Sequence, residues 1–130
     1  MDLALDASAL IAMIREEPGY AELVQKIQTA DRVVIGSPTV LEAAIALNAR
    51  TAGHATAQLF DYLDKMGADV VPFTEDHHLI AFNAFLRFGK GHHPARLNFG
   101  DCMSYAIATV ANLPLLYVGD DFSQTDIEAA

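Results

Sequence analysis

With 130 residues, 52% of them hydrophobic and 19% charged, the chain suits one domain, residues 1–130, that buries roughly two-thirds of its unfolded surface. No apolar run reaches about 18 residues, so no membrane span is expected. The 17 acidic and 8 basic side chains, a formal net charge of −9, argue against an ordinary basic nucleic-acid binder, and the single cysteine, Cys102, excludes an internal disulfide and favours the cytoplasm.

The first stretch, L-A-L-D-A-S-A-L at 3–10, predicts a short buried strand that turns at Asp6-Ala7-Ser8 into a helix reaching Ile14. Apolar residues at helical spacing predict a second helix over about 20–30. The run V-V-I at 33–35 predicts a second buried strand. After it, Ser37 is the expected N-cap and Pro38 the first residue of a helix that extends to about residue 50.

The second half of the chain continues the alternation. We expect a helix over about 55–66, a strand over 68–72 and a helix over 75–88. The breakers Gly89, Gly91 and Pro94 predict an irregular loop over 89–98, before a helix from Gly100 to about 112 and a strand over 115–118. Short apolar strands that alternate with helices pair in parallel and carry helices on both faces. The expected fold class is therefore α/β, with three layers and a parallel sheet.

Three acidic residues stand alone in long uncharged stretches. Asp6 is the only charge over 3–14, Glu42 the only one over 33–49, and Asp101 the only one over 97–119. Asp120 and Asp121 follow the last expected strand. A buried carboxylate is unfavourable by several kcal/mol unless it is compensated. Ligands bind at the carboxyl ends of parallel strands, which makes these acids candidates for chemistry.

Each acid also has a purely structural interpretation. Asp101 could complement the positive end of its helix, Glu42 could be exposed on an amphipathic helix, and Asp6 could be a turn or N-cap residue. Asp120 and Asp121 could be ordinary turn residues. As a set, however, converging carboxylates repel one another unless a cation lies among them. Oxygen ligands without Cys or His favour Mg²⁺ or Mn²⁺, and a water on such a metal can attack a phosphodiester.

Four motifs together resemble a PIN-domain ribonuclease and, more narrowly, the VapC toxins of bacterial type II toxin–antitoxin pairs. They are D-A-S-A-L at 6–10, S-P-T-V-L-E at 37–42, N-F-G-D-C-M-S-Y-A at 98–106 and G-D-D-F at 119–122. The resemblance covers essentially the whole chain. It implies a sheet of order 3-2-1-4-5 and an acidic Mg²⁺ site that cuts RNA, although residues 123–130 are short for a fifth strand.

By this resemblance Asp6, Glu42 and Asp101 match the first three acids of the family. The fourth lies in G-D-D-F, where Asp121, next to Phe122, is preferred over Asp120. The resemblance also implies an antitoxin whose tail crosses the acidic site with an Arg or Lys, and a toxin that dimerises. We expect exposed apolar area for such partners on the helices at 20–30 and 55–66.

Further polar residues lie near these motifs. Ser8 and Thr39 resemble positions that hold an acid or a water, but they could equally be helix caps, and Asn98 could orient Asp101 or simply terminate a loop. An acid-free segment contains three basic residues that could grip RNA phosphates or form a solvated loop: Arg87, Lys90 and Arg96. The neighbouring His92 and His93 lack the spacing of a zinc site.

Other functions are compatible with an acidic Mg²⁺ pocket. A phosphatase of the haloacid-dehalogenase type needs a second Asp two residues after the first, where this chain has Ser8. A receiver domain needs an Asp after the third strand, whereas Asp69 precedes its core. A PIN-like scaffold without activity is disfavoured because all four acids are present. Dinucleotide binding of the Rossmann type is disfavoured because no GxGxxG follows the first strand. An Mg²⁺-dependent endoribonuclease is therefore the leading hypothesis.

Overall fold

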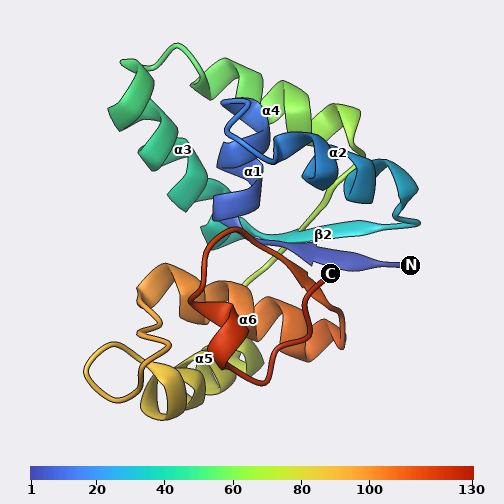
Figure 1. Cartoon of the computed structure of the whole chain (residues 1–130). Helices are drawn as coiled ribbons and strands as arrows, with labels where there is room; N and C mark the ends of the chain where they lie inside the picture. Colours follow the sequence, from blue (N-terminus) through green and yellow to red (C-terminus); the bar gives the residue numbers. More distant parts are fainter.

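Figure 1 shows the computed structural model of the chain, which describes all residues from 1 to 130. Four strands form one parallel sheet in the order β3-β2-β1-β4: β1 (Leu3–Leu5), β2 (Val33–Gly36), β3 (Asp69–Val71) and β4 (Leu115–Leu116). Six helices surround it: α1 (Ala7–Ile14), α2 (Tyr20–Thr29), α3 (Ser37–Thr51), α4 (Thr56–Lys65), α5 (Glu75–Phe88) and α6 (Phe99–Ala111). The three-layer α/β class and the parallel sheet are confirmed.

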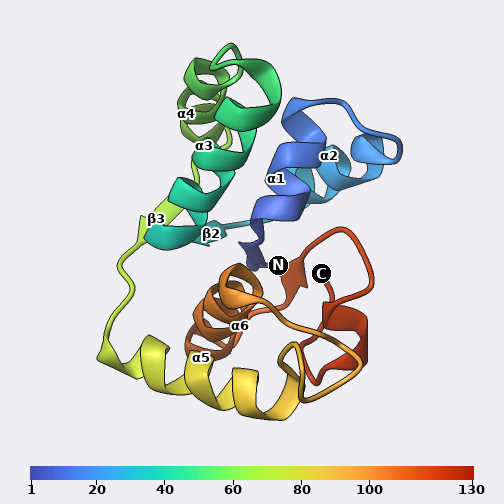
Figure 2. The same ribbon diagram turned by 90° about the vertical axis from the view of Figure 1, so that its left-hand side faces the viewer.

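The sheet separates two apolar cores. Figures 1 and 2 show the helices on its two sides, with α1, α2, α3 and α4 on one side and α5 and α6 on the other. Because side chains alternate along a strand, Leu3 and Leu5 of β1 pack with α1, α3 and α4, whereas Ala4 packs with α5 and α6. β1 lies between β2 and β4 and is fully buried. Whatever follows the carboxyl end of β1 is therefore enclosed by helices from both layers. None of the helices has both the length and the apolar composition that a membrane crossing requires.

Two junctions differ by one or two residues from the expected ones. Helix α1 begins at Ala7 with Asp6 as its N-cap, so Ala7 and Ser8 are helical and do not form a separate turn. At the next junction Gly36, in extended conformation, is the N-cap and Ser37 is already the first residue of α3. The prediction of Ser37 as N-cap was wrong because β2 continues through Gly36 and passes directly into the helix.

The last strand is shorter than expected, and the fifth is reduced to a single bridge. β4 ends at Leu116 because the next available amide, that of Val118, donates to Ser8 Oγ (3.0 Å) instead of to the sheet. Beyond it, Leu115 pairs in parallel with Ala129. The amide of Leu115 donates to the Glu128 carbonyl (2.8 Å), and that of Ala130 donates back to the Leu115 carbonyl (3.0 Å). The first four strands therefore follow the expected order 3-2-1-4, and the fifth strand is replaced by this single bridge beside β4.

Helix α6 has more buried residues than any other helix, and it packs against the strands β1, β2 and β4. Its core residues are small or apolar, among them Cys102, which is 5% exposed. Burial, and then the charge of Asp101, raises the pKa of the Cys102 thiol to about 11. Cys102 is therefore a buried hydrophobic residue rather than a reactive thiol.

Candidate functional site

Asp6 is the most buried acid of the chain, 4% exposed, at the point where β1 passes into α1. Its Oδ2 accepts hydrogen bonds from the Ser8 amide (3.1 Å) and the Ser8 hydroxyl (2.6 Å), and its Oδ1 accepts one from Ser104 Oγ (2.5 Å). Three donors offset much of the cost of burying the charge. Asp6 is thus the N-cap that its structural interpretation required and, at the same time, a carboxyl group whose position is fixed at the carboxyl edge of the sheet.

Ser104 is a site residue that the sequence did not indicate. It lies in α6, one turn after Asp101, and is 1% exposed. Thr39, also 1% exposed, contacts Ser104 Oγ at 3.4 Å and so reaches Asp6 only through that serine. The spacing Asp101–Ser104, three residues on one helix, was the available signal, because side chains at i and i+3 share a face.

Glu42 projects from α3 towards the start of α6. A Cβ built on Gly100 would lie 1.8 Å from Glu42 Oε2, so the carboxylate rests directly against the glycine backbone. Burial, and then the charge of Asp6, raises the pKa of Glu42. Glu42 therefore faces the same enclosed region as Asp6 and is not an exposed residue of an amphipathic helix.

Asp101 occupies the third position of α6 and forms a reciprocal cap with Asn98. The Asp101 amide donates to Asn98 Oδ1 (2.8 Å), and the Asn98 amide donates to Asp101 Oδ2 (3.1 Å). Asn98 therefore does orient this carboxyl. Burial first, and then the charges of Asp6 and Asp121, together raise the pKa of Asp101 to about 7, against the hydrogen bond from Asn98, which lowers it. A cap alone would favour the carboxylate, so burial and, after it, the neighbouring acids account for the opposite direction.

Asp121 and its neighbour Asp120 differ in what they face. Asp121 lies close enough to Asp101 to raise its pKa both by charge and by a hydrogen bond, whereas Asp120 contributes nothing to it. Both side chains are exposed. The structure thus brings Asp121, not Asp120, to Asp101.

The donor set fits a hard divalent cation in kind. Its side chains offer only carboxylate oxygens, and the pKa of both Glu42 and Asp101 is raised, first by burial and then by neighbouring carboxylates. As the side chains stand, no three acidic, histidine or cysteine groups are close enough together to hold one ion. The four acids therefore converge on one region without forming a preformed ligand cage.

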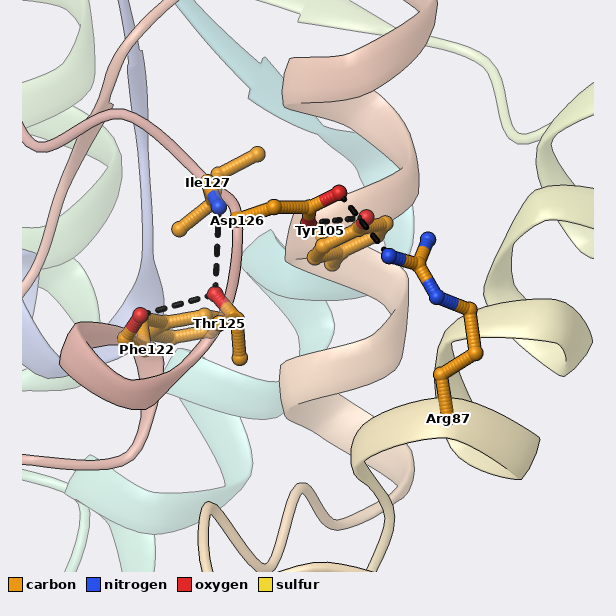
Figure 3. Close-up of polar contacts among 6 residues, drawn as sticks. All are labelled: Arg87, Tyr105, Phe122, Thr125, Asp126 and Ile127. Carbon is orange, nitrogen blue, oxygen red and sulfur yellow. Dashed lines mark hydrogen bonds and ion pairs between the residues drawn. The ribbon is translucent and has the colours of Figure 1, made fainter.

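The basic segment contains one paired and two unpaired residues. Arg87 Nη2 lies 3.2 Å from Asp126 Oδ2 (Figure 3). The guanidinium carbon of Arg87 lies 4.6 Å from the centre of the Phe88 ring. Lys90 and Arg96 are exposed and form no ion pair. His92 and His93 pack edge-on against different rings, those of Phe85 and Phe88. Arg87 is thus engaged within the fold, whereas Lys90 and Arg96 are available to a ligand.

Comparison with known proteins gives concordant matches over the whole chain. Residues 3–128 match the PIN domain family. Ribonuclease VapC36 of Mycobacterium tuberculosis is 44% identical over 128 residues, which cover 97% of this chain and 91% of that protein. The crystal structure of VapC20 from the same organism, a Sarcin-Ricin loop cleaving toxin, superposes with a TM-score of 0.80 at 17% identity and covers 98% of each chain. A toxin–antitoxin complex from Klebsiella pneumoniae superposes with a TM-score of 0.72 at 16% identity, over 95% of this chain and 92% of that one.

Proposed function

The chain belongs to the PIN domain family and, within it, to the VapC ribonucleases, and from this premise we propose that it is a toxin that cleaves RNA at a carboxylate site dependent on Mg²⁺, or alternatively Mn²⁺. The observation that carries the proposal is the convergence of Asp6, Glu42, Asp101 and Asp121 at one edge of the sheet. We further propose that residues 1–130 act as one domain in the cytoplasm. The phosphotransfer alternative is not favoured, because Ser8 holds Asp6 where a phosphatase would need a second acid.

The acids divide into one that is fixed and others that can adjust. Asp6 accepts three hydrogen bonds that fix its position, while Glu42 and Asp101 have a raised pKa and hold a proton more readily. A bound divalent cation would supply an activated water and neutralise charge on the phosphodiester. We propose that Asp6, Glu42, Asp101 and Asp121 hold this cation, with Asp101 as its carboxylate once the proton is displaced.

The direct test is incubation of the purified protein with defined single-stranded and structured RNAs, with Mg²⁺ and with EDTA. We expect cleavage only when the metal is present. Phosphorylation of the protein by a small phosphodonor, without RNA cleavage, would instead support the phosphotransfer alternative and refute the proposal.

We propose that Lys90 and Arg96 hold RNA without taking part in the chemistry. Both are exposed and unpaired in a protein of net charge −9, which leaves few other contacts for phosphates. Changing both to Gln should weaken RNA binding and lower the salt slope of log K by about 0.7 per lost phosphate contact. Arg87 is a weaker candidate because Asp126 already pairs with it. Unchanged binding across a salt series would mean that the loop is merely solvated.

An antitoxin partner follows from the same family, and the Klebsiella neighbour is itself a toxin–antitoxin complex. The groove between α2 and α4 has a volume of about 390 Å³ and an apolar lining that includes Val24, Ile27, Tyr62 and Met66. The acidic site lacks a basic neighbour, which suits a partner segment with an Arg or Lys. We propose that the antitoxin occupies this groove and extends a basic residue to the site.

A second copy of the chain is the other proposed partner. We expected exposed apolar area on the helices at 20–30 and 55–66. Only Phe60 is exposed there, because the other large apolar side chains of α2 and α4 are buried or half-buried against the core. Most of the exposed apolar residues lie instead on three other helices: Leu41, Ile45, Leu79, Phe82, Leu86 and Phe99. Between α5 and α6, a hollow of about 570 Å³ is lined by aromatic side chains such as Phe82 and Phe99. A symmetric contact would cover it.

Light scattering tests both partners. The purified protein should have the mass of a dimer, Phe82→Ser should lower it to that of a monomer, and Phe60→Ser, an equally exposed control on α4, should not. Addition of the neighbouring gene product should increase the mass and inhibit cleavage. A strictly monomeric wild type would refute the dimer, and a neighbouring gene product that neither binds nor inhibits would refute the antitoxin.

A further inference from the structure

The segment after β4 is fixed to helices α5 and α6 through a single carboxylate, that of Asp126. Tyr105 Oη donates to Asp126 Oδ1 (2.5 Å), and Arg87 Nη2 donates to Asp126 Oδ2 (3.2 Å), as Figure 3 shows. Tyr105 is only 5% exposed. Burial, and then the hydrogen bond to Asp126, raises the pKa of Tyr105 to about 12, so that its hydroxyl remains the donor throughout the neutral range. Neither Tyr105 nor Asp126 has a place in the proposed chemistry.

The chain between Asp121 and Asp126 has little freedom. Residues Phe122–Gln124 form a 3-10 turn, and the Phe122 side chain is buried against the ring of Tyr117. Thr125 Oγ1 donates to the Phe122 carbonyl (2.7 Å) and accepts from the Ile127 amide (3.2 Å). Figure 3 shows these bonds joining the turn to Thr125 and Ile127, the two neighbours of Asp126 in the chain, while Tyr105 and Arg87 hold the Asp126 carboxylate. A displacement of Asp126 would therefore be transmitted to Asp121.

The other end of this connection lies on the helix that carries Asp101. Tyr105 follows Asp101 by four residues in α6, that is, by one turn on the same side of the helix. The Tyr105–Asp126 bond thus joins the helix that carries one site acid to the segment that carries another. Asp121 is itself exposed and follows the exposed residues Gly119 and Asp120, so its position depends on the buried Phe122 next to it and on this link from Asp126.

We propose that Asp126, held by Tyr105 and Arg87, is a positioning residue that fixes Asp121 opposite Asp101 and so determines how tightly the four acids hold their cation. This inference rests on the proposed function and adds to it a residue five positions beyond the last site acid. It also assigns Arg87 to the support of the acidic site rather than to the RNA. Partners that orient metal-binding groups typically change metal affinity by 10–100-fold when removed.

The test compares two matched changes, Asp126→Asn and Asp69→Asn. Each removes the acid of an exposed ion pair of similar accessibility, but the pair Arg32–Asp69 lies at the β3 edge, away from the four acids. Mn²⁺ binding to the metal-free protein, measured by calorimetry, should weaken about tenfold in Asp126→Asn and stay unchanged in Asp69→Asn. Amide hydrogen exchange over 119–124 should be faster in Asp126→Asn alone. The Mg²⁺ concentration for half-maximal cleavage should rise by the same factor, with little loss of rate at saturating metal.

If Asp126→Asn does not fold, the same measurements are made on Tyr105→Phe, which removes the hydroxyl and keeps the ring. Wild-type Mn²⁺ affinity and wild-type exchange in these variants would overturn the inference, even if they melt at lower temperature, because Asp126 would then be only a structural link. The proposed function is refuted by a different result, a wild-type protein that does not cleave RNA with Mg²⁺. In that case the exchange measurement would still show whether Asp126 positions Asp121.

Discussion

Replacing Asp101 with Asn is expected to lower the rate of RNA cleavage by at least about 10³-fold, because a cation's stabilisation of the reacting phosphodiester is worth several kcal/mol. The change keeps an oxygen that can accept the Asn98 amide, so the cap of α6 survives. Cleavage of a defined RNA under single-turnover conditions measures the loss. A circular dichroism spectrum like that of the wild type would show that the variant is folded.

The other acids provide the internal controls for this result. Asp6→Asn and Glu42→Gln should each abolish cleavage in the same way, although Asp6→Asn also disturbs the N-cap of α1. Asp121→Asn should lower the rate more than Asp120→Asn, because only Asp121 interacts with Asp101. The reverse order would transfer the fourth role to Asp120, and near-wild-type cleavage by any single variant would remove that residue from the site.

The second large effect concerns stability, where Asp101→Asn should be more stable than the wild type when no metal is present. The pKa of Asp101 is raised to about 7 in the folded protein, from an ordinary value of 3.8. An acid with a raised pKa favours folding below its unfolded pKa and loses that contribution as the pH rises through the folded one. After allowance for solvent screening of this half-buried carboxyl, we expect a gain of about 1–2 kcal/mol at pH 8 for the variant.

Thermal melts in EDTA and in Mg²⁺ over a pH series measure this effect. In EDTA the variant should melt a few degrees higher at pH 8, and the two proteins should converge as the pH falls below the ordinary pKa of 3.8, where Asp101 is protonated both folded and unfolded. Mg²⁺ should reverse the ranking, because the wild type gains roughly RT ln(1 + [L]/Kd) and the variant gains less. A variant that melts lower in EDTA, with no response to Mg²⁺ in either protein, would identify Asp101 as a helix cap only.

The positions of Asp6, Glu42 and Asp101 were predictable because each of these three residues is an isolated charge in an apolar stretch. An unpaired charge between buried segments needs a reason, and the α/β pattern indicated the edge at which Asp6, Glu42 and Asp101 meet. Ser104 carries no charge, and a serine among the small residues of a helix looks like an ordinary packing residue. Only its spacing of three residues from Asp101 pointed to the site. Its role depends on Asp6, 98 positions away in the sequence.

Arg87 illustrates the opposite case, a residue whose charge was visible and whose partner was not. The basic segment 87–96 suggested a phosphate-binding loop, but the pairing of Arg87 with Asp126 depends on how the last residues fold back onto α5 and α6. The exposed apolar surface was misplaced for the same reason. Amphipathic spacing gives the apolar side of a helix, but not which neighbours cover it. The apolar sides of α2 and α4 pack against the core that includes α1, whereas α5 leaves Leu79, Phe82 and Leu86 exposed.

The contact between Glu42 and Gly100 has a bearing on how such a protein evolves inside its own host. Where the glycine hydrogen now lies, even the methyl group of alanine would occupy the volume of the Glu42 carboxylate. Every missense change at this codon introduces a Cβ and displaces the Glu42 carboxylate, so nearly any of them should reduce activity, and the change to alanine does so with the net charge and the outer surface unaltered. If the proposed toxin function holds, a cell that inherits the alanine allele would still make a protein that the proposed antitoxin can bind, and it would carry an inactive copy rather than a missing one.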